Sequence, residues 1–340
     1  MNNSYIVEVR KSTQLRTERL LAKLSEAEAM VANKACVYAT GSFGRLEAGT
    51  DSDLDLFIVV KTKKEEKRGR PIRVNQLDGV DEIKLKYHIV SAVQEVGIAD
   101  FDGGGKYLDS HQIGDFTEWL GSQEDDYRNT LTGRLLMLLE SRPLLGKQVY
   151  DELLKNVIAA YFKDYETNKD NFVPAFLVND ILRMWRTFCV NYEFNRTKGG
   201  SDWKIKNLKL KYSRMLTCYS AILYLLAVFA KSNTVSPTAV KAMVGLTPTE
   251  RLESLLNSVF INAEAGRELL DEKIRRLLEL YSDFLAFAHM DRKTRDPDFE
   301  RDEAEWRQKS YQFGETFAEA LSIVGETDKG TSRLYRMILI

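Results

Sequence analysis

The stretch from Cys36 to Val60, CVYATGSFGRLEAGTDSDLDLFIVV, constrains the fold more than any other part of the chain. It predicts an apolar strand that ends at Gly41-Ser42, a short turn and helix, and a second strand that begins with Asp53 and Asp55. Successive side chains of a strand point to opposite faces, so two carboxylates separated by one residue can meet at one site. The intervening apolar residues then point into a core: Leu54, Leu56 and Ile58.

The chemistry of these side chains indicates a phosphate site with a divalent cation. Carboxylate oxygens suit Mg²⁺, which proteins bind through one or two carboxylates together with substrate phosphates. Where Gly41-Ser42 leaves a strand and opens a helix, backbone N–H groups, a hydroxyl and the positive end of the helix are available to those phosphates. A solvated acidic pair in a surface hairpin is the simpler alternative, but it does not explain the apolar run on either side.

The order GSFGR…SDLDL resembles the signature of the polymerase-beta-like nucleotidyltransferase superfamily, in the extended form seen in its bacterial members. The resemblance covers the chain up to about residue 110. It implies transfer of a nucleoside monophosphate from a nucleoside triphosphate such as ATP to an acceptor, with pyrophosphate leaving. Within the superfamily, the chain looks most like proteins that join a uridylyltransferase-type catalytic domain to a helical domain.

The resemblance also implies roles for particular residues. Asp53 and Asp55 would bind Mg²⁺, or Mn²⁺ in its place, in a site that holds two ions. A third carboxylate is expected on a later strand of the same sheet, as a further metal ligand and as the base that deprotonates the acceptor. Asp102 is favoured over Asp100 for this role, and Glu82 is the remaining candidate.

The same resemblance places the substrate phosphates beside the turn. Gly41 and Ser42 would hold the β and γ phosphates, and Arg45 would neutralise charge as pyrophosphate leaves. The nucleotide base and the acceptor are left open, and the acceptor classes are a second nucleotide, an RNA end or a protein.

Length and periodicity predict two domains. A chain of 340 residues exceeds the usual size of one domain. We expect an α+β fold, with a small mixed-sheet nucleotidyltransferase domain at residues 1–115 and an all-α helical bundle at residues 116–340 that binds nucleotide or acceptor. The expected elements of the first domain are a helix over Thr13–Asn33 and strands at Cys36–Ala39, Leu54–Val60, Ile83–Val90 and Val96–Phe101.

Composition limits the other classes of function. The net charge of −1 marks no general binder of polyanions, so any such contact must use a local patch. The three cysteines lie in apolar stretches and predict reduced core residues. The first residues lack an apolar signal core, and no run reaches the ~20 apolar residues that span a bilayer. We therefore expect a cytoplasmic protein without a membrane partner, and apolar bundle faces make a homodimer reasonable.

Two basic segments each have two interpretations. Lys61–Arg73, KTKKEEKRGRPIR, is either a solvated, mobile loop or a basic flap beside the active site that touches a triphosphate or a polyanionic acceptor. The later run DWKIKNLKLKYSR is either the exposed face of a core helix or a set of phosphate contacts. Within it, Lys206 and Lys209 are the candidate nucleotide-binding residues.

A second class of function also fits the sequence. A catalytically silent nucleotide sensor, or an antitoxin-type protein that binds a partner, could keep the same fold. The intact pair of Asp53 and Asp55 favours the enzyme. Replacing both by Ala separates the two classes, because an enzyme loses turnover and a partner-binding module keeps its partner.

Overall fold

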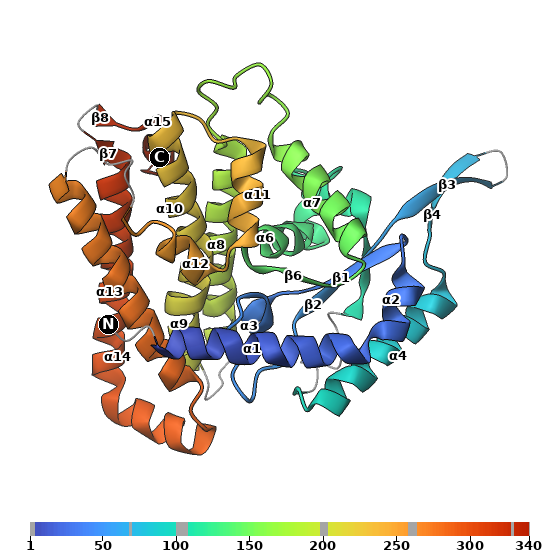
Figure 1. Ribbon diagram of the computed structural model, residues 1–340, viewed down its shortest axis with the longest axis horizontal. Coiled ribbons are helices and arrows are strands. Elements are labelled where there is room, and N and C mark those ends of the chain that lie inside the picture. The colour runs from blue at the N-terminus through green and yellow to red at the C-terminus, as the bar shows by residue number, and fades with distance from the viewer. Residues whose placement is uncertain are drawn as a thin grey trace. The chain divides into compact units, whose positions relative to one another are not determined.

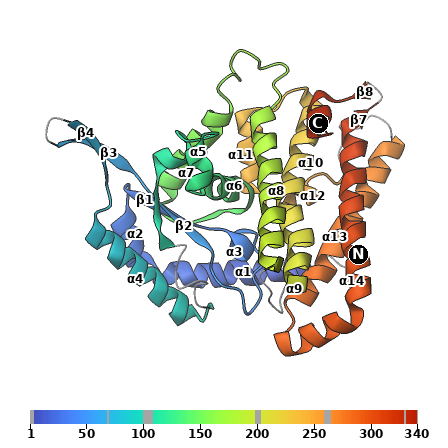
Figure 2. The same ribbon diagram turned by 180° about the vertical axis from the view of Figure 1, so that it is seen from behind.

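The structure is a computed structural model that describes residues 4–67, 70–99, 108–197, 203–257, 264–327 and 330–339. The chain divides into two compact units, one of residues 7–160 and one of residues 1–6 and 161–340 (Figures 1 and 2). The first unit contains a small mixed sheet, and the second is almost entirely helical. The expected α+β class is therefore confirmed.

The sheet of the first unit has four strands in the order β5-β2-β1-β6. β1 pairs antiparallel with both β2 and β6, and β2 pairs parallel with β5. The two central strands, ACVYA and LFIVV, are buried along their whole length, as expected for continuous apolar runs covered on both faces. The strands are β1 (Ala35–Ala39), β2 (Leu56–Val60), β5 (Ser110–Gln112) and β6 (Arg142–Leu145).

Helices cover both faces of this sheet. Leu56 and Ile58 belong to a core cluster with Leu20, Leu85 and Ile89 on one face. The helices on that face are α1 (Ser4–Lys23), α2 (Ser25–Val31) and α4 (Gly79–Val96). The opposite face is covered by η3 (Ile113–Phe116) and α6 (Thr130–Glu140), where the Tyr38 hydroxyl donates to the Gly133 carbonyl at 3.2 Å. The expected helix over Thr13–Asn33 is thus two helices, and it begins earlier in the chain.

The predicted strand at Ile83–Val90 is wrong, because these residues lie within α4. The side chain of Asp78 accepts a hydrogen bond from the Asp81 amide at 2.8 Å and caps the helix start. At the other end, Gly97 adopts the left-handed conformation with φ of 72°. The alternation that suggested a strand came from Ile83 and Tyr87, which are 71% and 67% exposed.

The predicted strand at Val96–Phe101 is also not formed as expected. α4 continues to Val96, and only Ala99 makes a strand-like bridge, parallel to Asp53. Asp100 and Asp102 lie outside the described residues.

The basic segment Lys61–Arg73 is a β-hairpin rather than a loop. β3 (Thr62–Lys67) pairs antiparallel with β4 (Arg70–Asn75) in a separate two-stranded sheet. Figure 1 shows this hairpin projecting from the first unit. It follows the end of β2, whereas Asp53 and Asp55 precede the start of β2, so the segment does not lie beside the predicted active site.

The first unit is longer than the expected domain of residues 1–115. β6 adds an edge strand to β1, and α6 packs on the sheet, so the compact unit continues to residue 160. The remaining helices of this part of the chain are α3 (Gly41–Gly44), α5 (Gln123–Tyr127) and α7 (Lys147–Tyr161).

The second unit is a bundle built around a cluster of aromatic rings. Tyr212 stacks on Phe284 with ring centroids 4.5 Å apart, and Phe313 packs against both Tyr212 and Phe317. Two short strands also occur, β7 (Glu326–Thr327) and β8 (Gly330–Thr331). The helices are α8 (Ala175–Thr197), α9 (Trp203–Lys209), the π-helical segment η4 (Leu210–Arg214), α10 (Met215–Ser232), α11 (Pro237–Gly245), α12 (Pro248–Glu253), α13 (Glu264–Ala288), α14 (Arg292–Gly325) and α15 (Arg333–Leu339).

One continuous helical stretch of the described chain, Trp203–Ser232, is long and apolar enough to cross a membrane by length and composition. Of its most apolar window, 61% is buried inside the protein, which is typical of a core helix. The three cysteines are free, with Cys36 and Cys218 buried and Cys189 half-buried.

Candidate active site

The turn after β1 packs directly against the predicted metal-binding strand. The Thr40 amide donates to the Asp55 carbonyl at 2.8 Å and extends the pairing of β1 with β2 by one residue. Gly41 follows with φ of 61°, a left-handed conformation that glycine adopts at no steric cost. A Cβ atom at Gly41 would lie 2.2 Å from Oδ2 of Asp55. This position therefore requires glycine both for its backbone conformation and for space beside the carboxylate.

The two aspartates lie as the strand pattern predicts. Leu54 is buried in the core cluster, whereas Asp53 and Asp55 are half-buried and belong to the alternate set of positions that continues with Phe57. Asp53 also bridges Ala99, which brings the residue directly preceding Asp100 beside the aspartate strand. The structure thus places Gly41, Asp53 and Asp55 at one end of the central strands.

A buried network of three charged side chains contacts the turn. Arg45 donates from Nη1 to Oε2 of Glu140 at 2.8 Å and from Nε to Oε1 of Glu47. Oε1 of Glu140 accepts from the Gly41 amide at 3.2 Å. All three charged side chains are at most 8% exposed. The carboxylate of Glu140 therefore connects the end of α6 to the first amide of the Gly-Ser turn.

The backbone of the turn also contacts Glu140. A Cβ atom at Gly44 would lie 1.9 Å from the Glu140 carbonyl oxygen, so α3 approaches the end of α6 as closely as glycine permits. Sequence reasoning identified Arg45 but missed Glu47 and Glu140. The one signal for Glu140 is that it is an acidic residue following the apolar run LLMLL.

The loop between the turn and the aspartates is fixed by α1. The hydroxyl of Thr13 accepts from the Ala48 amide at 2.9 Å, and Arg16 donates to the Gly49 carbonyl at 2.7 Å. The Arg16 guanidinium also lies over the Phe43 ring, 5.1 Å from its centroid. Thr13 therefore anchors the loop from within α1.

A described acid also lies near the aspartate strand. Ser110 pairs with Ile58, so one further step of this parallel register places Asp109 beside Phe57, in the same alternate set as Asp55. Glu82, the remaining predicted candidate, pairs instead with Lys86 on α4 at 2.7 Å. Asp109 was missed because the preceding residues were assigned to strands that do not form.

The residues present suit a divalent cation that is shared with a substrate. Within the part of the chain that the structure describes, no group of three or more His, Cys, Asp or Glu side chains could hold a metal ion alone. Two carboxylates next to a glycine turn do fit Mg²⁺, because this ion takes few protein ligands and completes its shell with phosphates and water. The close approach of Gly41 to Asp55 leaves backbone, rather than a side chain, at the position where phosphate would sit.

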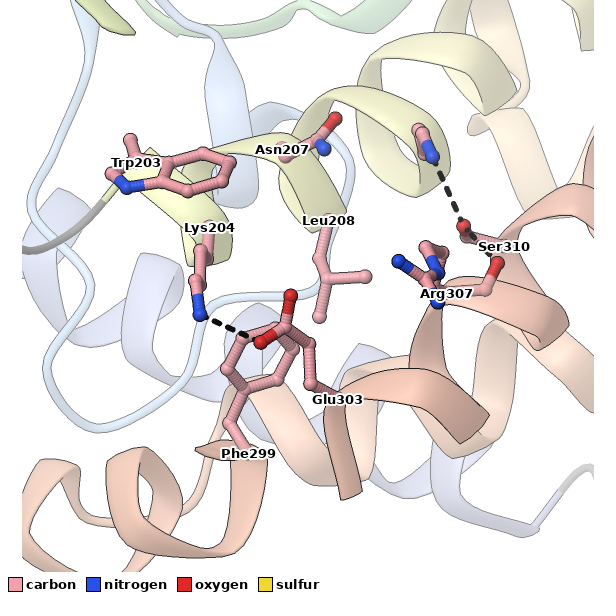
Figure 3. A pocket seen from close by; sticks show the side chains of 9 residues that line it. Trp203, Lys204, Asn207, Leu208, Phe299, Glu303, Arg307 and Ser310 are labelled. Atoms are coloured by element: carbon pink, nitrogen blue, oxygen red, sulfur yellow. Dashed lines mark hydrogen bonds and ion pairs between the residues drawn. The ribbon is translucent and has the colours of Figure 1, made fainter. Parts of the chain in front are cut away.

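The predicted basic residues of the second unit fall into two sets. Lys206 and Lys209 are exposed. Lys204 and Lys211 instead line a cavity of about 40 Å³ on α9, η4 and α14 (Figure 3). Its other lining residues are Trp203, Asn207, Leu208, Phe299, Glu303, Arg307 and Ser310.

The charges of this cavity are partly paired. Lys204 forms an ion pair with Glu303 at 2.6 Å, as Figure 3 shows. Lys211 donates to the Ser310 hydroxyl at 3.4 Å and lies over the Tyr311 ring, 4.1 Å from its centroid. These contacts favour a stabilising role for the two lysines that face the cavity.

The structure places a glycine turn beside two aspartates at one end of the central strands. Residues 18–132 match the family model described as "Nucleotidyltransferase domain". This part of the chain therefore belongs to the polymerase-beta-like nucleotidyltransferase superfamily, as the GSFGR…SDLDL pattern indicates. The match includes the turn, the aspartate pair and the first residues of α6. No curated protein and no solved structure matches the chain.

Proposed function

We propose that the protein is a Mg²⁺-dependent nucleotidyltransferase that moves a nucleoside monophosphate from a nucleoside triphosphate to an acceptor and releases pyrophosphate. The observation that carries this proposal is the close approach of the Gly41 backbone to the Asp55 carboxylate, which leaves no room for a Cβ atom, with Asp53 in the same set of strand positions. A solvated acidic pair would not require a glycine at that point. The nucleotidyltransferase domain supports the class of reaction.

The chain's own residues divide the work of phosphoryl transfer. Asp53 and Asp55 would hold Mg²⁺, or Mn²⁺ in its place. When bound, the ion supplies Lewis-acid stabilisation of the charge that develops on the transferred phosphoryl group. Gly41 and Ser42 would bind the β and γ phosphates through backbone amides and the hydroxyl, and so orient the α-phosphate toward the acceptor.

We assign Arg45 to positioning rather than to direct contact with pyrophosphate. Its side chain is 8% exposed, and its guanidinium is already engaged by the carboxylates of Glu47 and Glu140. Glu140 in turn accepts from the Gly41 amide. The network therefore fixes the direction in which the turn presents its remaining amides.

The base that accepts the proton of the acceptor hydroxyl or amine would be the third carboxylate. Asp102 and Asp100 remain proposed for this role, and the bridge between Ala99 and Asp53 supports them because it brings the preceding residue to the site. Asp109 is a third candidate because its register on β5 places it near β2. Separate replacement of each by Asn distinguishes them, since only the base variant should lose turnover and keep nucleotide binding.

The helical unit would contribute nucleotide or acceptor contacts through its basic face. Lys206 and Lys209 are the proposed contacts, since the side chains of both are exposed. The alternative is that they form a solvated helix face. Lys206→Gln with Lys209→Gln should raise KM for the nucleotide if the contact exists.

The test is incubation of the purified protein with Mg²⁺ and each α-labelled nucleoside triphosphate, alone and with cell extract. Pyrophosphate release and transfer of label onto a nucleotide, RNA or protein are followed together. We expect Asp53→Ala and Asp55→Ala to abolish transfer. Asp51→Ala, an exposed acid in the same loop, is the matched control. Unchanged turnover in both aspartate variants would overturn the mechanism, and nucleotide binding without turnover would favour a sensor.

A further inference from the structure

The β3–β4 hairpin has a charge unlike that of the whole protein. Its two strands, TKKEEK and RPIRVN, carry five basic and two acidic residues, whereas the complete chain has a net charge of −1. Charged side chains on an exposed edge, lysine especially, also prevent edge-to-edge aggregation. That role does not engage the charge, so the same cations can also bind an external anion.

The register of β3 and β4 places like charges opposite each other, which lowers the stability of the hairpin. Lys64 lies opposite Arg73, and Lys67 lies opposite Arg70. Like charges directly opposite each other destabilise an antiparallel pair, and an isolated two-stranded hairpin is at best marginally stable in water. An acid opposite Lys64 or opposite Lys67 would stabilise the hairpin, so strand pairing does not explain why these two positions carry cations.

The first unit holds this hairpin at its base. Gln112 donates to the Asn75 side chain at 3.0 Å, and the Gln76 amide donates to the Lys61 carbonyl at 2.8 Å. On one side, Arg73 forms an ion pair with Glu118 at 2.6 Å. Figure 1 shows the two strands of the hairpin projecting away from these anchors.

The described cations of β3 differ in how they are paired. Lys63 forms an ion pair with Glu65 at 2.8 Å. Lys64 is exposed and has no ion-pair partner among the residues that the structure describes. Part of the positive charge of β3 is therefore available to an external anion.

The distance between the hairpin and the candidate active site gives the minimum length of a ligand that contacts both. Asp55 and Thr62 lie at opposite ends of β2, and a strand rises by about 3.3 Å per residue, so they are about 20 Å apart. A mononucleotide cannot reach across this interval. One strand of a nucleic-acid duplex presents a phosphate every ~3.4 Å, so about six phosphates cover it.

We propose that the β3–β4 hairpin binds the phosphodiester backbone of a nucleic acid, whose end is the acceptor at the active site. The role as acceptor rests on the proposed function, whereas the binding itself does not. The two strands contain no aromatic residue, so they supply no platform for base stacking. Contact is therefore with phosphates, is independent of base sequence and weakens steeply with salt.

The experiment is fluorescence anisotropy on the full chain, without nucleoside triphosphate or Mg²⁺. The probes are a labelled 20-nucleotide RNA, a 20-base-pair DNA duplex and a 4-nucleotide RNA, each at several salt concentrations. The hairpin variant is Lys63→Gln/Lys64→Gln/Lys67→Gln. The matched control, Lys155→Gln/Lys163→Gln/Lys231→Gln, removes three exposed lysines outside the hairpin.

We expect the hairpin variant to bind the long probes at least about tenfold more weakly and to lower the slope of log K against log salt by about two, because Lys63 is already paired with Glu65. The control should bind like the wild type, and the short RNA should bind weakly to all three proteins. Preference for the RNA or the duplex identifies which nucleic acid supplies the phosphates. Thermal unfolding of each variant shows whether the fold is kept.

Three results would overturn the proposal. The first is equal affinity and equal salt slope for the hairpin variant and the wild type. The second is that polyglutamate of matched charge competes as well as nucleic acid, which would indicate an acidic protein partner. The third is binding to phosphatidylserine vesicles without binding to nucleic acid. Asp53→Ala should retain binding, so loss of turnover in that variant and loss of binding in the hairpin variant test the two proposals separately.

Discussion

The two ends of α6 carry buried ion pairs that differ in what they connect. Near the start of the helix, Arg134 donates to both carboxylate oxygens of Asp125, at 2.9 and 2.7 Å, and so joins α5 to α6. At the other end, Glu140 accepts from Arg45 at 2.8 Å and from the Gly41 amide at 3.2 Å. The second pair is therefore linked to the turn that faces the aspartates.

This difference separates stability from function. A buried ion pair gains little net free energy over apolar residues of similar volume, yet loss of one partner is costly because the other charge is left without compensation. For Arg134 and Asp125 that cost should appear only as lost stability. For Glu140 it should also appear as lost turnover, because the same carboxylate sets the position of the phosphate turn.

Arg134→Leu should produce the largest change. Asp125 would remain buried without its charge partner, and the free energy of unfolding should fall by about 3–5 kcal/mol. Turnover per folded molecule should stay the same. Urea denaturation measures the first quantity, and the steady-state rate divided by the concentration of folded protein measures the second. The double variant Arg134→Met/Asp125→Leu should recover most of the stability, and a loss below about 1 kcal/mol in the single variant would contradict this account.

Gly41→Ala should have the next largest effect, on turnover. The new methyl group would lie 2.2 Å from Oδ2 of Asp55, so either the turn or the carboxylate must move. A displacement of about 1 Å in an active site can cost about 100-fold in rate. Gly79→Ala is the control, because nothing lies within 4 Å of its Cβ position. Turnover of Gly41→Ala within threefold of the wild type would show that the turn does not position the substrate.

Glu140→Gln should have a smaller and mixed effect. The amide oxygen can still accept from Gly41, but the charge that pairs with Arg45 is lost. We expect about a tenfold loss of turnover and a loss of about 1–3 kcal/mol in unfolding free energy. Asp125→Asn is the matched variant at the other end of α6. If both variants lower turnover per folded molecule equally, the functional distinction between the two ends of the helix fails.

The parts of the site that the sequence predicted are those held by neighbours in the chain. Gly41, Asp53 and Asp55 come together through one pair of adjacent strands, and their residue types report their chemistry directly. Glu140 reaches Arg45 across 95 residues, and nothing in the local pattern indicates this contact. The contact depends on the pairing of β6 with β1, which brings the end of α6 next to the turn.

The fold errors have a similar cause. In IKLKYHIV the buried residues Leu85 and Ile89 are four apart and fit a helix, while the alternate spacing fits a strand equally well. The ambiguity is resolved by Asp78 and Gly97, which cap a helix that begins and ends outside that window. The hairpin was mistaken for a loop because its sequence is densely charged. Both faces of an exposed hairpin can be polar, so its strands need not show the apolar residues that mark a buried strand.

The smallest predicted effect is the pH dependence that Asp125 gives to stability. Burial by itself would raise the pKa of the Asp125 carboxyl, but hydrogen bonds from Arg134, Thr130 and the Gly121 amide together lower it. A lowered pKa contributes stability above the unfolded-state value near 3.9, and this stability is lost as the pH falls through the folded-state value. The loss is about 1.4 kcal/mol for each unit of difference between the two pKa values.

Urea denaturation between pH 5.5 and about 2.5 measures this contribution. The wild type should lose stability more steeply than Asp125→Asn, which has no carboxyl to protonate at this position. Asp126→Asn, at the exposed neighbouring residue, is the control for removing a carboxyl outside the buried pair. Parallel curves for the wild type and Asp125→Asn would mean that the buried pair does not hold this carboxylate in its charged form. The pair of Arg134 and Asp125 would then not act as a stabilising ion pair, and the comparison with Glu140 at the other end of α6 would fail.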